Sequence, residues 1–249
     1  MNKILLVEDN SQFREGANKY FNSRKDVELV YALNYDEAVK GLYAEPKIDG
    51  AVIDCFFPKK TGSGDISLGK EIVKKMESSD PDEKKRLEGL KVLGEYINLN
   101  DQDMRKYARH LINNTPEDDI LQNPIVKAIK QVSMLGKDVA TIIVKDTLGM
   151  TYQKNNLSKD YYDALRNAME KSETNQPLGI SIADKANELG IPFILATSTN
   201  HHDILTQPIQ DYVSRKGWGL VDCFQNRENE KATPEFWEKA FNELERKLK

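Results

Sequence analysis

The sequence has few cysteines, no long apolar run and no excess of basic residues. Its two cysteines, Cys55 and Cys223, each lie in an apolar run, so we expect buried reduced thiols in a cytoplasmic protein. No stretch approaches the roughly 18 apolar residues of a membrane span, and the N-terminus lacks the cleavage signal of a secreted precursor. Lys and Arg total 36 against 40 Asp and Glu, which argues against direct nucleic-acid binding through phosphate neutralisation.

The two ends of the 249-residue chain alternate short apolar runs with helical patterns. Continuous apolar runs bounded by polar residues are typical of strands buried on both faces of a parallel sheet. The expected strands are 3–7, 27–32, 51–56, 191–196 and 220–224. Their alternation with helices predicts an α/β fold built on a doubly wound, five-stranded parallel sheet.

Local signals mark where several helices begin. Asn34 is placed to cap the helix after the second strand. Pro234 follows Thr233 at the first position of the last helix, whose apolar stripe includes Trp237. These signals set the boundaries of the sheet domain's helices.

The middle of the chain breaks the alternation and predicts an all-α insertion. Four apolar faces recur at helical spacing between residues 87 and 169. We therefore expect a sheet domain at 1–65 plus 177–249 and a helical insertion at 66–176. Two segments, 67–69 and 177–179, could each open the third helix of the sheet domain. The second is favoured because it leads directly into a strand, which puts the insertion in the loop after the third strand.

Acidic residues follow two of the predicted strands. Glu8 and Asp9 come after the first strand, Asp54 lies in the third, and Thr197 follows the fourth. Because the carboxyl ends of parallel strands meet at one sheet edge, these side chains are expected to lie together. Three converging carboxylates need a cation, and oxygen ligands suit Mg²⁺. One of the carboxylates could then act as a nucleophile toward a phosphoryl donor.

These segments resemble the receiver domains of bacterial response regulators. The first strand and its acids, 4–10, are similar to the family's first strand, and the segment 191–198 is similar to its fourth. Asp54, followed by Pro58 and Gly62, has the offsets of the phosphoacceptor strand and its loop. The resemblance covers about 1–65 and 177–249, and it implies a flavodoxin-like sheet of order 2-1-3-4-5.

The resemblance also implies roles for individual residues. Glu8, Asp9, Asp54 and the carbonyl of Phe56 would hold Mg²⁺, with Asp54 as the phosphoacceptor. Thr197 would be the switch hydroxyl. Receivers carry a Lys after the fifth strand, but here that strand ends without one, and Lys231 in a longer loop is the best substitute.

Three functions are compatible with this sequence. The leading one is a phosphorylated signalling protein in two-component signal transduction, with a sensor histidine kinase or phosphodonor protein upstream and a partner protein downstream. Its only enzymatic activity would be self-phosphorylation, and we expect it to act without an output domain. The second is a pseudo-receiver scaffold that acts through the insertion without phosphorylation. The third, a hydrolase or phosphatase on the same acidic edge, lacks a supporting motif.

Several site residues also have plainer interpretations. Glu8 and Asp54 could be solvated residues at strand ends, and Thr197 could simply cap the next helix. The adjacent histidines His201 and His202 are a weak metal motif, because neighbouring side chains on a helix or strand point apart and no other ligand cluster accompanies them.

Overall fold

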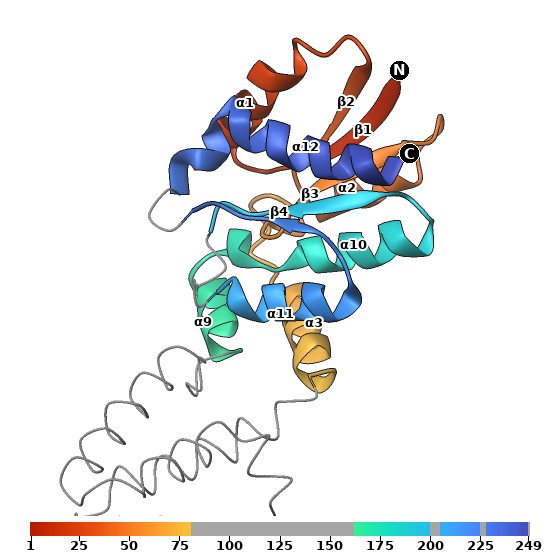
Figure 1. Ribbon diagram of the computed structural model, residues 1–249. Coiled ribbons are helices and arrows are strands. Elements are labelled where there is room, and N and C mark those ends of the chain that lie inside the picture. Colours follow the sequence, from red (N-terminus) through yellow and green to blue (C-terminus); the bar gives the residue numbers. More distant parts are fainter. Residues whose placement is uncertain (81–161, 200–204, 225–227, 249) are drawn as a thin grey trace, which may run out of the picture. The chain divides into compact units, whose positions relative to one another are not determined.

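Five parallel strands form the centre of the computed structural model, which describes residues 1–80, 162–199, 205–224 and 228–248. The strands are β1 (Asn2–Val7), β2 (Val27–Ala32), β3 (Gly50–Asp54), β4 (Phe193–Ala196) and β5 (Leu220–Val221). Their order is β2-β1-β3-β4-β5 (Figure 1), which confirms the predicted doubly wound α/β fold.

The described helices include seven α-helices and two short 3₁₀ turns. In the first part of the chain they are α1 (Ser11–Phe21), α2 (Tyr35–Leu42) and α3 (Ser67–Ser78). In the second part they are α9 (Asp163–Lys171), η1 (Glu173–Asn175), α10 (Leu178–Glu188), α11 (Gln207–Lys216), η2 (Glu228–Ala232) and α12 (Pro234–Leu248).

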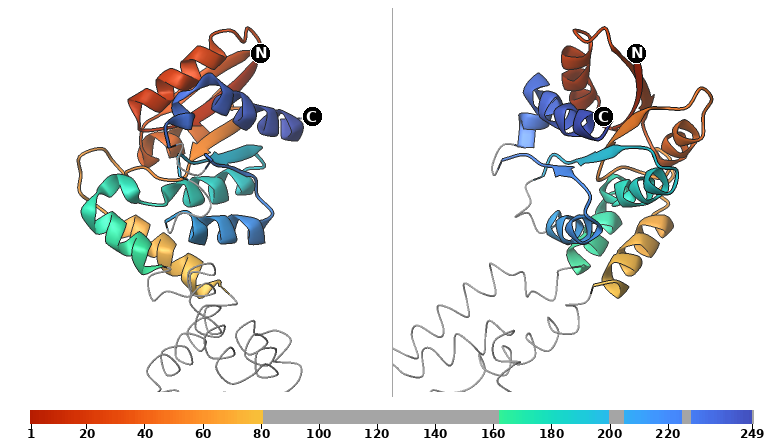
Figure 2. Two further views of the ribbon diagram at one scale, coloured as in Figure 1. Left: turned by 60° about the vertical axis from the view of Figure 1, so that its left-hand side comes forward. Right: turned by 45° about the vertical axis from the view of Figure 1, so that its right-hand side comes forward.

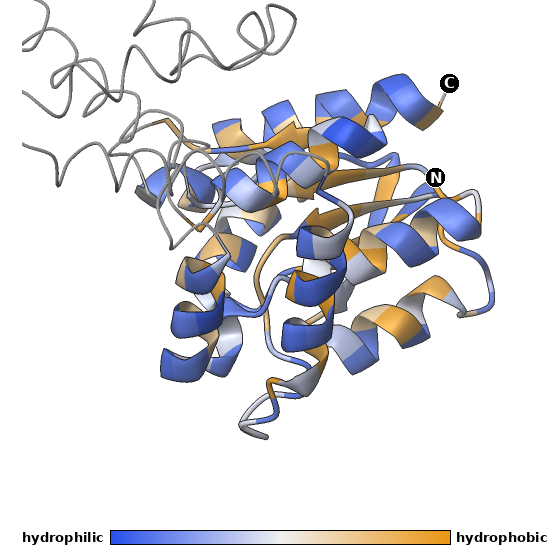
Figure 3. Ribbon diagram, turned by 90° about the horizontal axis from the view of Figure 1, so that it is seen from below, coloured by the Kyte–Doolittle hydropathy of each residue, from blue (hydrophilic) through white to orange (hydrophobic). Residues whose placement is uncertain are grey.

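Helices cover both faces of the sheet. On one face α1 and α12 pack together, and on the other lie α2, α10 and α11 (Figures 1 and 2). Hydrophobic residues are concentrated along the strands and on the helix faces turned toward them (Figure 3). Leu6, Val52 and Ile194 of the sheet meet Trp237 and Phe241 of α12 in this core. Burial of this apolar surface is the main stabilising contribution to the sheet domain.

Two helix starts agree with their sequence signals. The Asn34 side chain accepts a hydrogen bond from the backbone N–H of Glu37 at 3.0 Å, so it caps α2 as predicted. Pro234 is the first residue of α12. The fifth strand, in contrast, ends at Val221 rather than at 224. Among the described residues it pairs only with Leu195 and Ala196 of β4, so the strand stops where this pairing stops.

The helix that crosses from β3 to β4 is α10. It packs against both of these strands and against α2, whereas α3 packs on α10 and α9. Both α3 and α9 lie on the side of α10 away from the sheet (Figures 1 and 2). The segment beginning at 177 thus opens the third helix of the sheet domain, which was the favoured of the two alternatives.

The compact unit that holds the sheet extends further than residues 1–65 and 177–249. It comprises Met1–Asp80 and Tyr162–Lys249, and a second unit comprises Pro81–Tyr161. The boundaries differ from those expected because α3 packs onto α10, and α9 packs onto α3. The helical faces expected between 87 and 132 lie outside the described residues.

The start of α10 approaches the end of β3 closely. The N–H of Gly179 donates to the carbonyl of Cys55 at 3.2 Å. A Cβ on Gly179 would overlap the carbonyl oxygen of Asp54 and lie 2.8 Å from Cα of Cys55. A glycine at this position therefore lets the crossover helix pack against the strand that carries Asp54. None of the described helices has the length and apolar character required to cross a bilayer.

Replacing Gly179 by alanine should destabilise the sheet domain. The added methyl group meets backbone atoms that have no freedom to move aside, so we expect Gly179→Ala to lower the free energy of unfolding by about 1–3 kcal/mol. Urea denaturation followed by circular dichroism measures the change. Asn187→Ala, at an exposed position of the same helix, should change the free energy by less than about 0.5 kcal/mol. An equal effect of the two substitutions would contradict the close approach.

Candidate functional site

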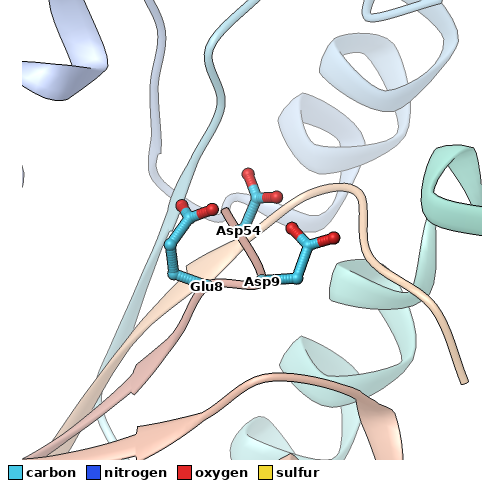
Figure 4. A group of neighbouring side chains, drawn as sticks. All are labelled: Glu8, Asp9 and Asp54. Atoms are coloured by element: carbon cyan, nitrogen blue, oxygen red, sulfur yellow. The ribbon is translucent and has the colours of Figure 1, made fainter. Parts of the chain in front are cut away.

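Three carboxylates converge at the carboxyl edge of the sheet. Val7 of β1 pairs with Ile53 of β3, so the residues that follow, Glu8 and Asp54, lie side by side. Asp9 turns its carboxylate toward the same point (Figure 4), and one oxygen from each of the three groups lies within 4.8 Å of the others. Glu8 and Asp54 are buried and Asp9 is half-buried. The structure thus brings together the three acids expected from the sequence.

Lys231 reaches this cluster from η2. Its Nζ lies 2.5 Å from Oδ1 of Asp54 and 2.6 Å from Oε2 of Glu8. The Lys231 side chain is 0% exposed, so the ammonium is held away from water between two carboxylates. Although β5 ends without a lysine, the chain returns through η2 and supplies the cation from a different element.

Neighbouring groups fix the position of Lys231. The indole N–H of Trp237 donates to the carbonyl of Lys231 at 2.7 Å. The Nζ lies 5.2 Å from the centre of the Phe13 ring and 5.7 Å from that of Trp237, within the range of cation–π attraction. A Cβ on Gly16 of α1 would lie 2.5 Å from the carbonyl oxygen of Ala232. The absence of a side chain at Gly16 lets η2 approach α1.

These supporting residues were not identified as functional from the sequence. The sequence places Trp237 only in the apolar stripe of the last helix. The acceptor of its indole N–H, the carbonyl of Lys231, lies six residues earlier in the chain and outside that helix. Gly16 is the one of these residues that the sequence could have indicated. Glycine inside a helix lowers helix stability by up to about 1 kcal/mol relative to alanine, so its presence usually has a packing reason.

Burial and mutual repulsion perturb the ionisation of the acids. Burial raises the pKa of Glu8 to about 8, although Lys231 opposes this shift. Burial and the neighbouring charge of Asp54 raise the pKa of Asp9 to about 6. Burial also raises the pKa of Asp54, against the opposing effect of Lys231. Burial by itself would lower the pKa of Lys231, but Asp54 and Glu8 outweigh it and raise that pKa.

The cluster has the character of a site for a hard divalent cation. Three carboxylates face one ammonium, so the ionised cluster carries excess negative charge. Within the described residues, the contact of Oε2 of Glu8 is the ion pair with the ammonium of Lys231 at 2.6 Å. Clustered carboxylate oxygens with more negative charge than one ammonium neutralises fit Mg²⁺. Glu8, Asp9 and Asp54 are the residues that would hold it.

The two remaining predicted residues lie at the same edge. Thr197 follows β4 beside Asp54, since Ala196 pairs with Asp54. Its buried Oγ1 is 2.8 Å from Oγ1 of Thr199 and not bonded to the acids. Phe56, two residues beyond Asp54, is half-buried, and the backbone N–H groups of Cys55 and Phe56 favour the ionised form of Asp54. His201 and His202 lie outside the described residues.

Comparison of the chain with models of protein families, with curated proteins and with solved structures found no match.

Replacing Lys231 by methionine should destabilise the protein more at pH 8 than at pH 5. Removing the ammonium leaves Glu8 and Asp54 buried without a counter-charge, which costs about 3–5 kcal/mol when they are ionised. Because the pKa of Glu8 is raised from 4.5 to about 8, this carboxyl holds its proton at pH 5 and the cost is smaller there. Urea unfolding followed by circular dichroism at both pH values measures this difference.

The control for this experiment is Lys239→Met. Lys239 is an exposed lysine of α12, and its loss should change the free energy of unfolding little at either pH. For the wild type, raised carboxyl pKa values mean that the folded chain binds more protons than the unfolded chain. Its stability should therefore fall as pH rises from about 4 toward 8. A loss in Lys231→Met that is the same at both pH values would contradict the buried ion pair.

Proposed function

We propose that this protein is a receiver-like signalling protein in which Asp54 accepts a phosphoryl group with the help of Mg²⁺. The observation that carries the proposal is the ammonium of Lys231, 2.5 Å from a carboxylate that also faces Glu8 and Asp9. Such a transfer needs a nucleophilic carboxylate and further acids that bind a divalent cation. It also needs a buried positive charge that pairs with the phosphoryl group of the product.

Each group has a defined task in the proposed reaction. An oxygen of Asp54 attacks the phosphorus of a phosphohistidine or an acyl phosphate, a new P–O bond forms, and the donor leaves with the electron pair of the broken bond. Glu8, Asp9, Asp54 and the carbonyl of Phe56 would hold Mg²⁺, which would supply positive charge to neutralise the transferred group. The ammonium of Lys231 then pairs with a phosphoryl oxygen. The hydroxyl of Thr197 donates to another.

The proposal extends to location and partners. A sensor histidine kinase or another phosphodonor protein would supply the phosphoryl group, and a protein partner would recognise the phosphorylated form. The buried side chains of Cys55 and Cys223 suit a reducing, cytoplasmic location.

A pseudo-receiver scaffold is the second candidate, and the burial of the ion pair favours it. The side chains of Glu8 and Lys231 are 0% exposed, and that of Asp54 is 9% exposed. A closed cluster of this kind could serve only to fix the sheet edge, with partner binding carried out elsewhere. The insertion through which such a scaffold would act was expected at 66–176, and its residues 81–161 lie outside the described residues.

Mg²⁺ binding tests the metal part of the proposal. We expect isothermal titration to give a Kd of about 1 mM or tighter, which corresponds to about 4 kcal/mol or more. Asp54→Asn removes one of the three carboxylates and should weaken binding by about tenfold or more. Asp36→Asn makes the same change at an exposed residue of α2 and should leave the Kd unaltered. Wild-type affinity in Asp54→Asn would refute the assigned metal site.

Phosphoryl transfer separates the two candidate functions. Incubation with acetyl phosphate and Mg²⁺ should add one phosphoryl group, seen by intact-protein mass spectrometry and removed by hydroxylamine. The adduct should form in Asp36→Asn and be absent from Asp54→Asn. Lys231→Met should lower its yield, because the phosphoryl charge then lacks its buried counter-ion. Mg²⁺ binding without any adduct in the wild type would favour the scaffold.

A further inference from the structure

A fully buried glutamine, Gln176, binds the loop that follows β3. Its Nε2 donates to the carbonyl of Asp65 and to that of Glu173, each at 3.0 Å. Its Oε1 accepts from the N–H of Gly69, in the first turn of α3, at 3.2 Å. A Cβ on Gly69 would lie 2.9 Å from this oxygen, so the glycine leaves room for the amide. The side chain thus ties residue 176 to the loop and to the start of α3.

The amide of Gln176 contributes position more than stability. Both Nε2 and Oε1 have hydrogen-bond partners inside the protein. Folding exchanges such bonds for bonds with water, so their net contribution to the free energy of folding is small. Hydrogen bonds are directional, however, and three of them from one side chain hold the backbone of residue 176 in one place.

The backbone of Gln176 in turn holds the peptide unit between Phe56 and Phe57. The carbonyl of Gln176 accepts from the N–H of Phe57 at 3.2 Å. The preceding peptide unit is held in a similar way, because the carbonyl of Cys55 accepts from the N–H of Gly179 at 3.2 Å. Two successive peptide units beyond the end of β3 are therefore bound to the start of α10 and to the turn before it.

These bonds determine the direction of the Phe56 carbonyl. In a trans peptide unit the N–H and the C=O point in opposite directions. Because the N–H of Phe57 points at Gln176, the carbonyl of Phe56 points away from that residue. Among the residues that the structure describes, no hydrogen bond reaches this carbonyl. Its oxygen is thus available to a ligand, two residues beyond Asp54.

We infer that Gln176 is a positioning residue of the metal site: its amide fixes the peptide unit that presents the Phe56 carbonyl to the cation. The inference rests on the proposed function, in which Glu8, Asp9, Asp54 and this carbonyl would hold Mg²⁺. Removal of a group that orients a metal ligand typically lowers metal affinity by about 10–100-fold. We therefore expect the affinity to depend on a residue that contacts none of the three carboxylates.

Mg²⁺ and Ca²⁺ differ in their response to a displaced ligand. Mg²⁺ requires nearly octahedral geometry with oxygens at about 2.0–2.1 Å, whereas Ca²⁺ accepts about six to eight oxygens at about 2.3–2.6 Å in a flexible arrangement. Displacement of one carbonyl should therefore weaken Mg²⁺ binding more than Ca²⁺ binding. A general loosening of the fold would weaken the binding of both ions alike.

The first experiment measures the Kd of both ions by isothermal titration. Gln176→Met keeps the length of the side chain and removes its three hydrogen bonds. It should raise the Kd of Mg²⁺ by about tenfold or more and that of Ca²⁺ by less than about threefold. Asn187→Leu removes an exposed amide of α10 and should change neither value. Leu244→Ala removes buried apolar atoms beside Gly50, at the opposite end of β3, and should lower stability without altering either Kd.

A second variant displaces the amide instead of removing it. The added Cβ of Gly69→Ala would meet Oε1 of Gln176 at 2.9 Å and force the side chain to shift. This variant should also weaken Mg²⁺ binding more than Ca²⁺ binding. It decides the question if Gln176→Met does not fold, which circular dichroism establishes for each variant.

The second experiment observes the carbonyl directly. Phe56 and Phe57 are the only two adjacent phenylalanines in the sequence. Protein labelled with ¹³C and ¹⁵N in phenylalanine alone therefore gives one signal in an NMR spectrum that correlates each carbonyl carbon with the N–H of the next residue. Addition of Mg²⁺ to the wild type should shift the carbonyl carbon of this signal. In Gln176→Met the N–H resonance should shift before any metal is added, because its bond to the carbonyl of residue 176 is weakened.

The outcomes distinguish this inference from the proposed function. If Mg²⁺ binds without moving the Phe56 carbonyl signal, or if Gln176→Met weakens both ions equally or neither, the inference is refuted while phosphorylation of Asp54 can still be found. If Gln176→Met weakens Mg²⁺ selectively but the wild type accepts no phosphoryl group from acetyl phosphate, the inference holds and the proposed function fails. If the wild type binds no Mg²⁺, both are refuted.

Discussion

The buried contact of the Lys231 ammonium with Glu8 and Asp54 is the interaction on which the carboxyl edge of the sheet depends. Parallel pairing of β1 with β3 forces these two carboxylates together, and without a cation between them they would repel each other in a medium of low dielectric constant. The ammonium opposes that repulsion, since it lowers the pKa of both carboxyls. It also requires η2 to lie against α1, which is possible because Gly16 has no side chain there.

The same contact leaves the edge short of positive charge. One ammonium serves three carboxylates, and burial together with the neighbouring charge of Asp54 raises the pKa of Asp9. A divalent cation would offset this excess of negative charge, and a transferred phosphoryl group would then draw on both the cation and Lys231. Burial and the closeness of the carboxylates raise the free energy of ionising the site. The same two features favour the binding of a cation, and then of an anionic group beside that cation.

Packing between distant segments connects this edge to the rest of the domain. The loop after Asp54 is held by Gln176, a fully buried residue whose side chain donates to the carbonyl of Asp65 and accepts from the N–H of Gly69. Gly179 brings α10 onto the end of β3. Together these contacts link the acidic site with the helices from which segment 81–161 departs and to which it returns.

The sequence by itself determined the elements of the sheet domain and the acids at its edge. Short apolar runs, the cap at Asn34 and the proline at 234 act within a few residues of where they lie, so the spacing of residues reveals them. Parallel pairing then implied that Glu8, Asp9 and Asp54 would meet. Lys231 could be named as a candidate cation, but nothing near it in the chain fixed where its side chain would lie.

Only the tertiary structure decided the rest. The position of Lys231 depends on Gly16 and Trp237, which act from α1 and α12. The grouping of α3 and α9 with the sheet depends on the packing of α3 against α10 and of α9 against α3. The length of β5 depends on the residues of β4 with which it pairs. Contacts between segments far apart in the chain leave no periodic pattern in the sequence. The residue on one side of such a contact depends on its partner in the other segment, and the local spacing of residues does not identify that partner.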